Sequence, residues 1–225
     1  MLFRSGSIDA GFFGSLVYGI TRARIGIVPL VRPVQLNGKS TYTGLLFACK
    51  DAGIKRPEDM KGKTIALVDP ATAAGYLAQR EYFAEHGIIM ENDLKIYWAG
   101  SHEAAIRAVL SHQADIGGAK NTIVARFRKE NRTFDTVIDI LNENPKKGLP
   151  DNTFAVRKEM EPATREKLKK TLLTMNSDPE GKAVLARFGA IRFIPTSDED
   201  YKPLYDWIRH LKIDLASYPC NKSAQ

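Results

Sequence analysis

The stretch GKTIALVDPATAAGY (residues 62–76) decides the fold of this chain. Residues 65–68 form a continuous apolar run, which is typical of a strand covered on both faces. Asp69 and Pro70 end the run, and residues 75–87 then have the pattern of a helix that closes at Gly87. The order of strand, short turn of small residues and helix is the repeating unit of an α/β fold.

The start of this helix is a candidate anion site. The first N–H groups of a helix have no partner inside it, and the aligned peptide dipoles make this end partly positive. The small side chains of Ala73 and Ala74 would let a ligand approach the backbone near Gly75, and Thr72 can add a hydroxyl donor. The same residues also describe an ordinary corner that Thr72 merely caps, and the spacing alone does not separate the two interpretations.

Strand-like and helix-like segments alternate along the rest of the chain, which predicts βα units throughout. Ser101 or His102 follows a strand at 94–98 and begins a helix, and Asn121 lies at the start of another helix. Near the amino terminus, Gly14 and Ser15 occupy a fourth helix start. Because such junctions gather at the carboxyl edge of a parallel sheet, we expect a ligand to bind there. Further strands are predicted at 25–31, 42–48, 114–119, 136–141 and 153–157, and further helices at 161–176, 178–189 and 198–210.

The composition predicts a globular protein that favours anionic ligands. Hydrophobic residues make up 44% of the 225 residues, and the formal net charge is +7. The densest basic clusters, at 126–129 and 167–170, have helical spacing with apolar neighbours, which indicates solvated helix faces. No nucleic-acid-binding signature accompanies them, so no nucleic-acid partner is expected. No apolar stretch approaches the roughly 20 residues that a membrane span needs.

The sequence predicts neither a metal site, nor a cofactor, nor an enzyme. Cys49 and Cys220 lie far apart and fit no metal-binding spacing, and the four histidines form no His-Glu-x-x-His cluster. Neither a nucleophile elbow nor a phosphate-binding Walker loop is present. Cys49 lies in an apolar run typical of a buried free thiol, although a disulfide with Cys220 in an oxidising compartment remains open.

Several motifs, in order, resemble those of PhnD-like substrate-binding proteins of phosphonate and phosphate ABC transporters, a branch of the type 2 periplasmic binding proteins. The turn at 69–77 is similar to the Asp-Pro-x-Ser-Thr-Ser-Gly-aromatic-Leu loop of that family, and 51–63 to the segment before it. Residues 100–105, followed by 114–117, resemble a second signature, and 7–14 resemble the Gly-x-Ile-Asp-x-Gly strand. The resemblance covers most of residues 6–215.

The resemblance implies a type 2 architecture with two α/β lobes joined by a hinge. Lobe one is expected to comprise 1–44 and 150–225, and lobe two 45–149. Members of the family begin with a strand, a helix and a second strand that have no counterpart here, so the first lobe is expected to be incomplete, either by truncation or as a natural variant. The first five residues are too short and too polar for a signal peptide, and a periplasmic or extracytoplasmic location is implied by the resemblance only.

The resemblance also implies a function without chemistry, the capture of a small oxyanion in an inter-lobe cleft for an ABC transporter. The expected partners are a small anionic solute and a transporter permease or sensor kinase. An acid near the return crossing is expected to contact the ligand, with Asp139, Glu143 and Asp151 as candidates. Tyr42 matches the family's ligand-facing hinge tyrosine, although it could also be an aromatic residue of the core. His102 is expected to contact the ligand, although it could also be a helix cap without a ligand. The full set of expected ligand-binding residues is Gly14, Ser15, Tyr42, Thr72, Ala73, Ala74, Gly75, Ser101, His102 and Asn121.

The chain departs from the family where the loop has three hydroxyls, because Ala73 and Ala74 replace two of them. Each lost hydrogen bond would weaken binding by about 0.5–1.5 kcal/mol. Phosphonate, phosphite, phosphate, another oxyanion and a neutral metabolite therefore all remain open as ligands. Two other functions remain open on this fold: a ligand-sensing or interaction module of a signalling system, and an enzyme of thiamine-precursor synthesis. The enzyme would need a reactive cluster that the sequence lacks.

Overall fold

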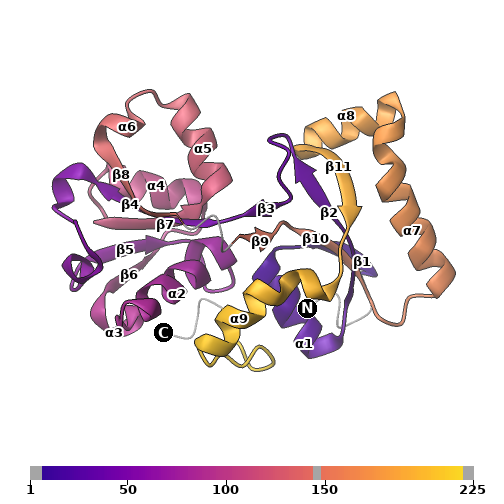
Figure 1. Cartoon of the computed structure of the whole chain (residues 1–225), viewed down its shortest axis with the longest axis horizontal. Helices are drawn as coiled ribbons and strands as arrows, with labels where there is room; N and C mark the ends of the chain where they lie inside the picture. Colours follow the sequence, from indigo (N-terminus) through magenta and orange to yellow (C-terminus); the bar gives the residue numbers. More distant parts are fainter. Residues whose placement is uncertain (1–6, 144–147, 220–225) are drawn as a thin grey trace. The chain divides into compact units, whose positions relative to one another are not determined.

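The computed structural model describes residues 7–143 and 148–219, and its internal contacts divide the chain into two units. Unit 1 comprises residues 1–41 and 149–218, and unit 2 comprises residues 42–148 with 219–225 (Figure 1). The chain enters unit 2 through β3 (Thr41–Tyr42) and returns through β9 (Leu149–Pro150), and these two short strands pair with each other.

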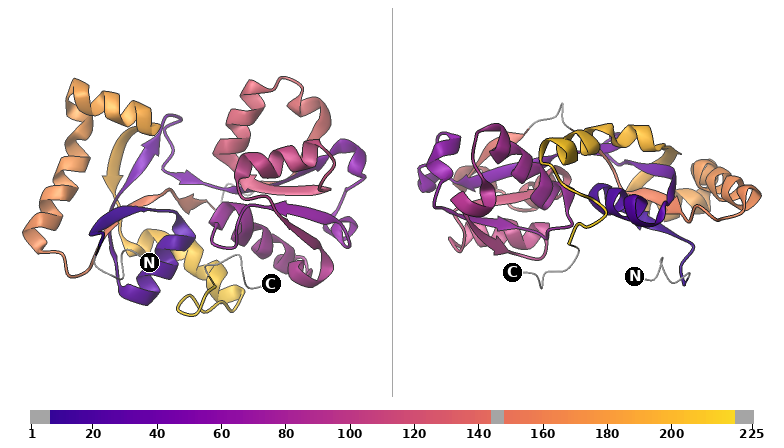
Figure 2. Two further views of the ribbon diagram at one scale, coloured as in Figure 1. Left: turned by 180° about the vertical axis from the view of Figure 1, so that it is seen from behind. Right: turned by 90° about the horizontal axis from the view of Figure 1, so that it is seen from below.

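Unit 1 is built on a four-stranded antiparallel sheet in the order β1-β10-β2-β11. An apolar cluster that includes Leu30, Val31, Leu185 and Phe193 joins the sheet to α7 and α8. The helices α1 and α9 lie side by side on the same unit (Figures 1 and 2). The bounds are β1 (Ala10–Phe13), α1 (Ser15–Ile25), β2 (Val28–Gln35), β10 (Thr153–Val156), α7 (Pro162–Thr174), η5 (Met175–Ser177), α8 (Pro179–Phe188), β11 (Ala190–Pro195), η6 (Asp198–Tyr201) and α9 (Lys202–His210).

One carboxylate ties α1 to the α9 region. Asp198 Oδ1 accepts hydrogen bonds from the hydroxyls of Tyr18, at 2.8 Å, and Tyr205, at 2.6 Å, and from Nε of Arg22. Burial by itself would raise the pKa of Asp198, but these hydrogen bonds outweigh it and lower the pKa. The carboxylate is therefore charged at neutral pH and holds three donors from two helices.

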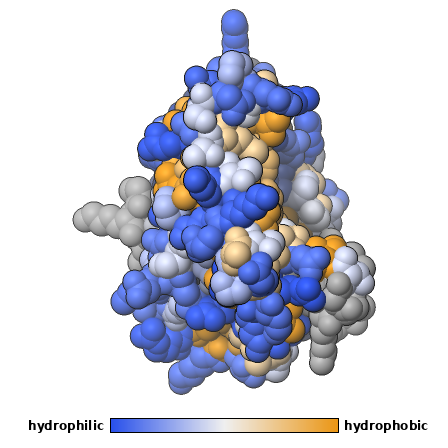
Figure 3. Space-filling view, turned by 90° about the vertical axis from the view of Figure 1, so that its right-hand side faces the viewer, coloured by the Kyte–Doolittle hydropathy of each residue, from blue (hydrophilic) through white to orange (hydrophobic). Residues whose placement is uncertain are grey.

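The surface of unit 1 beside α7, α8 and β11 is mostly hydrophilic with apolar spots (Figure 3). Val184, Phe188 and Ile191 are the exposed large apolar side chains of these elements. Phe188 also contacts Phe12 of β1, with ring centroids 4.9 Å apart. Scattered apolar side chains of this kind are normal for a protein surface.

Unit 2 is a five-stranded sheet in the order β6-β5-β7-β4-β8, with helices on both faces (Figures 1 and 2). β5, β6 and β7 are parallel, and β4 runs antiparallel to β7 and β8. Phe47, Ile106, Val109 and Val124 belong to the cluster that packs α4 and α5 onto one face. The bounds are β4 (Gly44–Cys49), η1 (Lys50–Ala52), η2 (Pro57–Met60), β5 (Thr64–Leu67), η3 (Ala73–Leu77), α2 (Ala78–Glu85), α3 (Met90–Asp93), β6 (Lys95–Trp98), α4 (His102–Leu110), β7 (Ile116–Lys120), α5 (Asn121–Glu130), α6 (Phe134–Val137) and β8 (Ile138–Glu143).

The α/β class predicted from the sequence is confirmed, with differences at individual elements. The predicted strand at 136–141 is wrong at its start, because Phe134 is buried in the core and residues up to Val137 form the helical turn α6. The predicted helix at 75–87 begins earlier, at Ala73, as the π-helical turn η3. None of the helices within 7–143 and 148–219 has the length and apolar character to cross a membrane.

Candidate functional site

The parallel strands of unit 2 place three strand-to-helix junctions at one edge of the sheet. The residues after β5, β6 and β7 share this edge, where the amino-terminal end of β4 also lies, since Gly44 pairs with Lys120. Backbone bonds link the junctions, because Gly100 N–H donates to the carbonyl of Val68 at 3.0 Å and Asn121 N–H to that of Thr43 at 3.0 Å. The predicted residues of unit 2 that lie along this edge are Tyr42, Thr72, Ala73, Ala74, Gly75, Ser101, His102 and Asn121.

The first junction is a wide turn rather than an ordinary helix start. Leu77 N–H donates to the carbonyl of Thr72 at 3.1 Å, which is the i→i−5 pattern of a π-helix. The N–H groups of Ala73, Ala74 and Gly75 all precede this first helical bond. Buried Gln79 holds the turn against β4 by donating to the carbonyls of Ala74, at 2.8 Å, and Leu45, at 3.1 Å. Gln79 therefore anchors the turn to β4, and the N–H groups of Ala73, Ala74 and Gly75 belong to the first turn of the helix.

Only glycine fits at position 75. A Cβ added there would lie 2.4 Å from Cγ2 of Val68, closer than real Cβ contacts, and 3.0 Å from Oγ1 of Thr72. The close approach allows Val68 N–H to donate to the Gly75 carbonyl at 3.2 Å. Gly75 therefore sets how tightly the turn folds back on the end of β5.

The hydroxyl of Thr72 is already engaged within the turn. Its Oγ1 donates to the carbonyl of Asp69 at 2.7 Å, and the Asp69 carboxylate accepts from Ala71 N–H at 2.9 Å. A hydroxyl has one proton, so Thr72 cannot donate to an anion in this arrangement unless it gives up the bond to Asp69. The main-chain amides are then the principal donors of this junction.

At the second junction, Ser101 is the cap of α4 and His102 is its first residue. Ser101 Oγ accepts from Ala104 N–H at 3.1 Å, a bond that uses a lone pair and leaves the hydroxyl its own proton. The sequence leaves Ser101 and His102 open as the cap, and the structure selects Ser101.

His102 connects the second junction to the third as an acceptor. Its Nδ1 accepts a hydrogen bond from Lys120 N–H at 3.1 Å, which assigns the proton of the neutral ring to Nε2. Burial, and then the nearby charge of Lys120, lower the pKa of His102 to about 4. Charge-assisted donation by a protonated His102 therefore does not apply at neutral pH, where the ring is a neutral Nε2–H donor.

The third junction contributes an amide side chain and a cation. Asn121 Oδ1 accepts from Thr43 N–H at 3.2 Å, so Nδ2 is the donor that Asn121 can turn to a ligand. Lys120 Nζ lies 4.3 Å from the ring centroid of Tyr42, a cation–π geometry. Tyr42 is 5% exposed, as a core aromatic would be. Its contact with Lys120 nevertheless places it at this edge of the sheet.

Thr43 is a residue of this edge that the sequence analysis missed. It is 7% exposed, and its Oγ1 has no hydrogen-bond partner among the residues that the structure describes. A buried hydroxyl without a partner is costly and often marks a place where a ligand or water completes the bonding. Its position next to Tyr42 is the sequence signal that would have drawn attention to it.

The other two residues predicted to bind the ligand, Gly14 and Ser15, belong to unit 1. Gly14 precedes α1, and the fully buried Ser15 donates from Oγ to the Pro150 carbonyl at 2.6 Å, so its hydroxyl supports the return crossing. Of the three acids proposed near that crossing, Asp139 and Glu143 are exposed and Asp151 is 4% exposed. Asp151 accepts from Nε2 of Gln35 and, at 2.8 Å, from Asn152 N–H.

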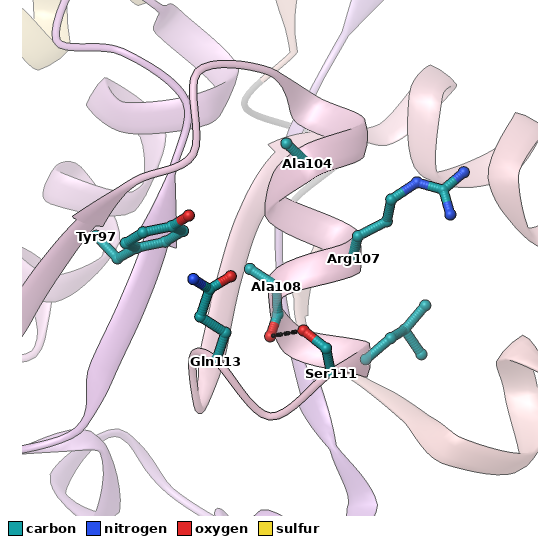
Figure 4. Close-up of a pocket in the computed structure, with 7 residues that line it drawn as sticks. Tyr97, Ala104, Arg107, Ala108, Ser111 and Gln113 are labelled. Atoms are coloured by element: carbon teal, nitrogen blue, oxygen red, sulfur yellow. Dashed lines mark hydrogen bonds between the residues drawn. The ribbon is translucent and has the colours of Figure 1, made fainter.

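A surface hollow of about 450 Å³ lies elsewhere on unit 2, along the side of α4 (Figure 4). Tyr97, Arg107, Ser111 and Gln113 are its polar lining residues, and Ser111 Oγ donates to the Ala108 carbonyl at 3.3 Å. None of the predicted ligand-binding residues lines it. The hollow follows the helix toward its carboxyl end, where the carbonyl dipoles disfavour an anion, although the cation Arg107 is among its lining residues.

Comparison with known proteins assigns the family. The model of the family described as "ABC transporter, phosphonate, periplasmic substrate-binding protein" matches residues 1–201. The chain is 23% identical over 207 residues to the phosphonates-binding periplasmic protein of Escherichia coli, covering 89% of this chain and 60% of that protein. It is 28% identical over 134 residues to the phosphate-import protein PhnD of Mycolicibacterium smegmatis, covering 53% and 40% respectively. The chain therefore spans 60% or less of the length of these two relatives.

Solved structures show the same fold. PhnD1 of Prochlorococcus marinus in complex with methylphosphonate has a TM-score of 0.77 at 18% identity, covering 94% of this chain and 81% of that one. XAC2383 of Xanthomonas citri has a TM-score of 0.80 at 22% identity, covering 94% and 79%. The predicted resemblance and fold are confirmed, whereas the predicted incomplete first lobe stays a prediction. The chain belongs to the family of periplasmic substrate-binding proteins of phosphonate ABC transporters.

Proposed function

We propose that this chain binds a small oxyanion of the phosphonate, phosphite or phosphate class at the edge of unit 2 where the three junctions meet, as the solute-capturing component of an ABC transporter. The observation that carries the proposal is the convergence of two helix starts and the neutral Nε2–H donor of His102 on one edge of a parallel sheet. Membership of the phosphonate-binding family supports the choice of ligand class.

The donors at this edge suit a compact ligand with several oxygen atoms. The amides of Ala73 to Gly75 and of the first turn of α4 provide main-chain donors with a favourable dipole. Ser101, His102 and Asn121 each add a side-chain donor, and Lys120 adds a positive charge. None of these groups is an activated nucleophile or a charged base, so binding proceeds without a chemical step.

The hydroxyl-poor turn predicts weaker side-chain recognition than the three-hydroxyl loop of the family. Ala73 and Ala74 leave main-chain amides as the donors there, and these contact oxygen atoms without distinguishing a P–C from a P–O or P–H bond. Selectivity among phosphonate, phosphite and phosphate then depends on contacts with the fourth substituent on phosphorus, which is carbon, hydrogen or oxygen respectively. We therefore expect binding of more than one of them.

Isothermal titration of the full chain with methylphosphonate, phosphite and phosphate tests the proposal. The informative variant is Asn121→Asp, because the carboxylate keeps the acceptor for Thr43 N–H but replaces the amide donor by a negative charge. We expect at least a tenfold loss of affinity for every oxyanion that the unmodified chain binds. Asn92→Asp is the matched control, since it adds the same charge at an exposed position of α3 in the same unit.

Two results would count against the proposal. One is an absence of binding heat with all three oxyanions in a chain whose circular dichroism shows it to be folded. The other is an equal affinity of the Asn121→Asp and Asn92→Asp variants, which would place the anion elsewhere on the molecule.

The family also supports proposals on location and partner. We propose that the chain acts outside the cytoplasm and delivers its ligand to the permease of an ABC transporter, because the family model describes periplasmic substrate-binding components of such transporters. Co-purification of the chain with a candidate permease in the presence and absence of methylphosphonate would test the partnership. Recovery of the same amount of permease with and without the chain would contradict it.

A further inference from the structure

A second cluster of chemically active side chains lies in unit 2, away from the anion site. Cys49 ends β4, Asp51 lies in the following turn η1, and His112 follows the carboxyl end of α4. One potential ligand atom from each residue lies within 4.8 Å of the other two. Since β4 runs antiparallel to β7, its end at Cys49 lies at the edge of the sheet opposite to Gly44 and the anion site.

We propose that Cys49, Asp51 and His112 bind a zinc ion. Thiolate, carboxylate and imidazole are the three side-chain ligands that Zn²⁺ uses in proteins, and three protein ligands leave the fourth tetrahedral position to water. Zinc–ligand bonds of about 2.0–2.3 Å place neighbouring ligand atoms roughly 3.4–3.6 Å apart in a tetrahedron. The three atoms therefore need to approach one another by at most about 1.4 Å from a separation within 4.8 Å.

The two exposed ligands have the freedom to make this adjustment. The side chains of Asp51 and His112 are 72% and 67% exposed, and His112 Nε2 lies 4.0 Å from Asp51 Oδ2. His112 has a φ of 55°, a left-handed turn conformation that follows the carboxyl end of α4. Short side-chain rotations bring imidazole and carboxylate together without moving the strand or the helix.

Cys49 supplies the anchored ligand. It is 9% exposed, and its thiol lies 3.3 Å from the carbonyl of Val109, to which it donates. When the Zn–S bond forms, the S–H bond breaks, the proton leaves to solvent and the thiolate electron pair is shared with the metal, with no change of oxidation state. Lys50 Nζ donates to the Asp135 carbonyl at 2.7 Å and lies 4.0 Å from Asp139 Oδ1.

The proposal differs from the sequence-based prediction of no metal site, which stays a prediction until the titration below is done. That prediction rests on sequence spacing, which separates His112 from Cys49 by most of the βα units of unit 2. The antiparallel β4 and the end of α4 meet at the same edge of the sheet, so the fold brings together what the sequence keeps apart. A bound ion would join the end of β4, η1 and the turn after α4, and would stabilise unit 2 by mass action.

Titration of the metal-free full chain with Co²⁺, and then with Zn²⁺ as competitor, tests the site. We expect one equivalent of Co²⁺ to give a thiolate-to-cobalt charge-transfer band and the visible bands of a tetrahedral ion, both removed by Zn²⁺. Cys49→Ser should abolish the charge-transfer band, and His112→Ala should weaken Zn²⁺ binding at least tenfold. The matched controls are Cys220→Ser and His86→Ala, which remove the second cysteine and an exposed histidine of the same unit and should change neither readout.

The exposed ligands keep the test decisive if Cys49→Ser fails to fold. Asp51→Asn and His112→Ala alter only exposed side chains, and each should bind Zn²⁺ at least tenfold more weakly than the unmodified chain. The proposal is overturned if the unmodified chain shows no thiolate band with Co²⁺, or if His112→Ala binds Zn²⁺ as tightly as His86→Ala. A band that survives Cys49→Ser and disappears with Cys220→Ser would also overturn it.

Discussion

At the scale of single residues, His102 shows how burial decides the chemistry of a side chain. Its Nδ1 accepts from the backbone of Lys120, and burial followed by the charge of Lys120 lowers its pKa to about 4. A ring that stays neutral can accept on one nitrogen and donate on the other. The same ring, if protonated, would lose the bond to Lys120 N–H and face a lysine cation.

The lowered pKa of His102 predicts a stability change with pH. An unfolded histidine binds a proton below about pH 6.5, and folded His102 does so only below about 4. Between these values the unfolded state binds more protons, so the free energy of unfolding falls as the pH falls, by about 2 kcal/mol from pH 7 to pH 5. Urea unfolding of a Trp207→Phe chain, in which Trp98 reports on unit 2, measures this change.

The control for this measurement is His102→Asn. Asparagine Oδ1 can accept the Lys120 N–H bond but does not titrate in this range. The variant should lose about 2 kcal/mol less than the Trp207→Phe parent over the same pH interval. Equal slopes in the two chains would contradict the assignment of a buried, neutral His102.

The residues of the proposed anion site were predictable from the sequence in part. Ser101, His102 and Asn121 lie at the edge where strand-to-helix junctions were expected to gather, because parallel strands carry their following residues to one side. Tyr42, which precedes the antiparallel β4, was expected from the family resemblance alone. The internal bond of Thr72 to Asp69 and the unpartnered hydroxyl of Thr43 were not predictable. Both depend on the path of the backbone through the turn and the crossing, which residue types do not specify.

At the scale of elements, the corner between β5 and the π-turn η3 is held by a contact that excludes any side chain at position 75. The Cβ of an alanine there would lie 2.4 Å from Cγ2 and 2.6 Å from Cβ of Val68. Glycine to alanine normally stabilises a helix interior by about 1 kcal/mol. Whether Gly75→Ala raises or lowers the free energy of unfolding therefore distinguishes a simple helix turn from a tightly packed corner.

We predict that Gly75→Ala lowers the free energy of unfolding of unit 2 by about 1–3 kcal/mol, the usual cost of overpacking, and weakens oxyanion binding in the same variant. Urea unfolding followed by Trp98 fluorescence gives the first quantity and isothermal titration the second. The double variant Val68→Ala, Gly75→Ala should recover part of the loss, because the Cγ2 contact is removed while the contacts with Cβ of residue 68 and Oγ1 of Thr72 remain. The prediction of a tightly packed corner would be contradicted if Gly75→Ala raised the free energy of unfolding. It would also be contradicted if the double variant lost the full sum of the two single losses.

Element type was more predictable from the sequence than element boundaries. Apolar runs and helix caps located β5, β6, β7 and α4, since each of these depends on local pattern. The π-turn at Ala73–Leu77 and the helical turn at Phe134–Val137 were missed. In both cases tertiary packing, of Gly75 on Val68 and of Phe134 in the core, overrides the local pattern.

At the scale of the whole molecule, the positive net charge is expected to steer anions. The formal charge of +7 is spread along the chain, and Lys120 is the lysine at the proposed anion site. A field of this sign raises the rate at which a small anion meets the protein, and salt screens it over about 10 Å at 0.1 M ionic strength. The net charge therefore affects the association rate of the ligand more than the stability of the fold.

We predict that the association rate constant of methylphosphonate, measured by stopped-flow fluorescence, falls severalfold between about 0.02 and 0.2 M NaCl. Lys120→Gln should lower the rate constant at low salt and flatten its salt dependence. Lys95→Gln is the matched control, because it removes the same charge from an exposed position at the start of β6, on the opposite edge of the sheet. A rate constant that is independent of salt, or equally affected by the two variants, would show that the field plays no local role.

The π-turn also determines how this loop can change in length during evolution. A π-turn contains one more residue than an α-helical turn of the same span, since its bonds close at i→i−5 rather than i→i−4. Loss of a single codon within 73–77 would convert the turn to ordinary helix while leaving α2 in phase with the sheet. The length of the turn can thus change independently of its side-chain chemistry. Deletion of one residue would change the direction of the main-chain N–H groups without altering any polar side chain.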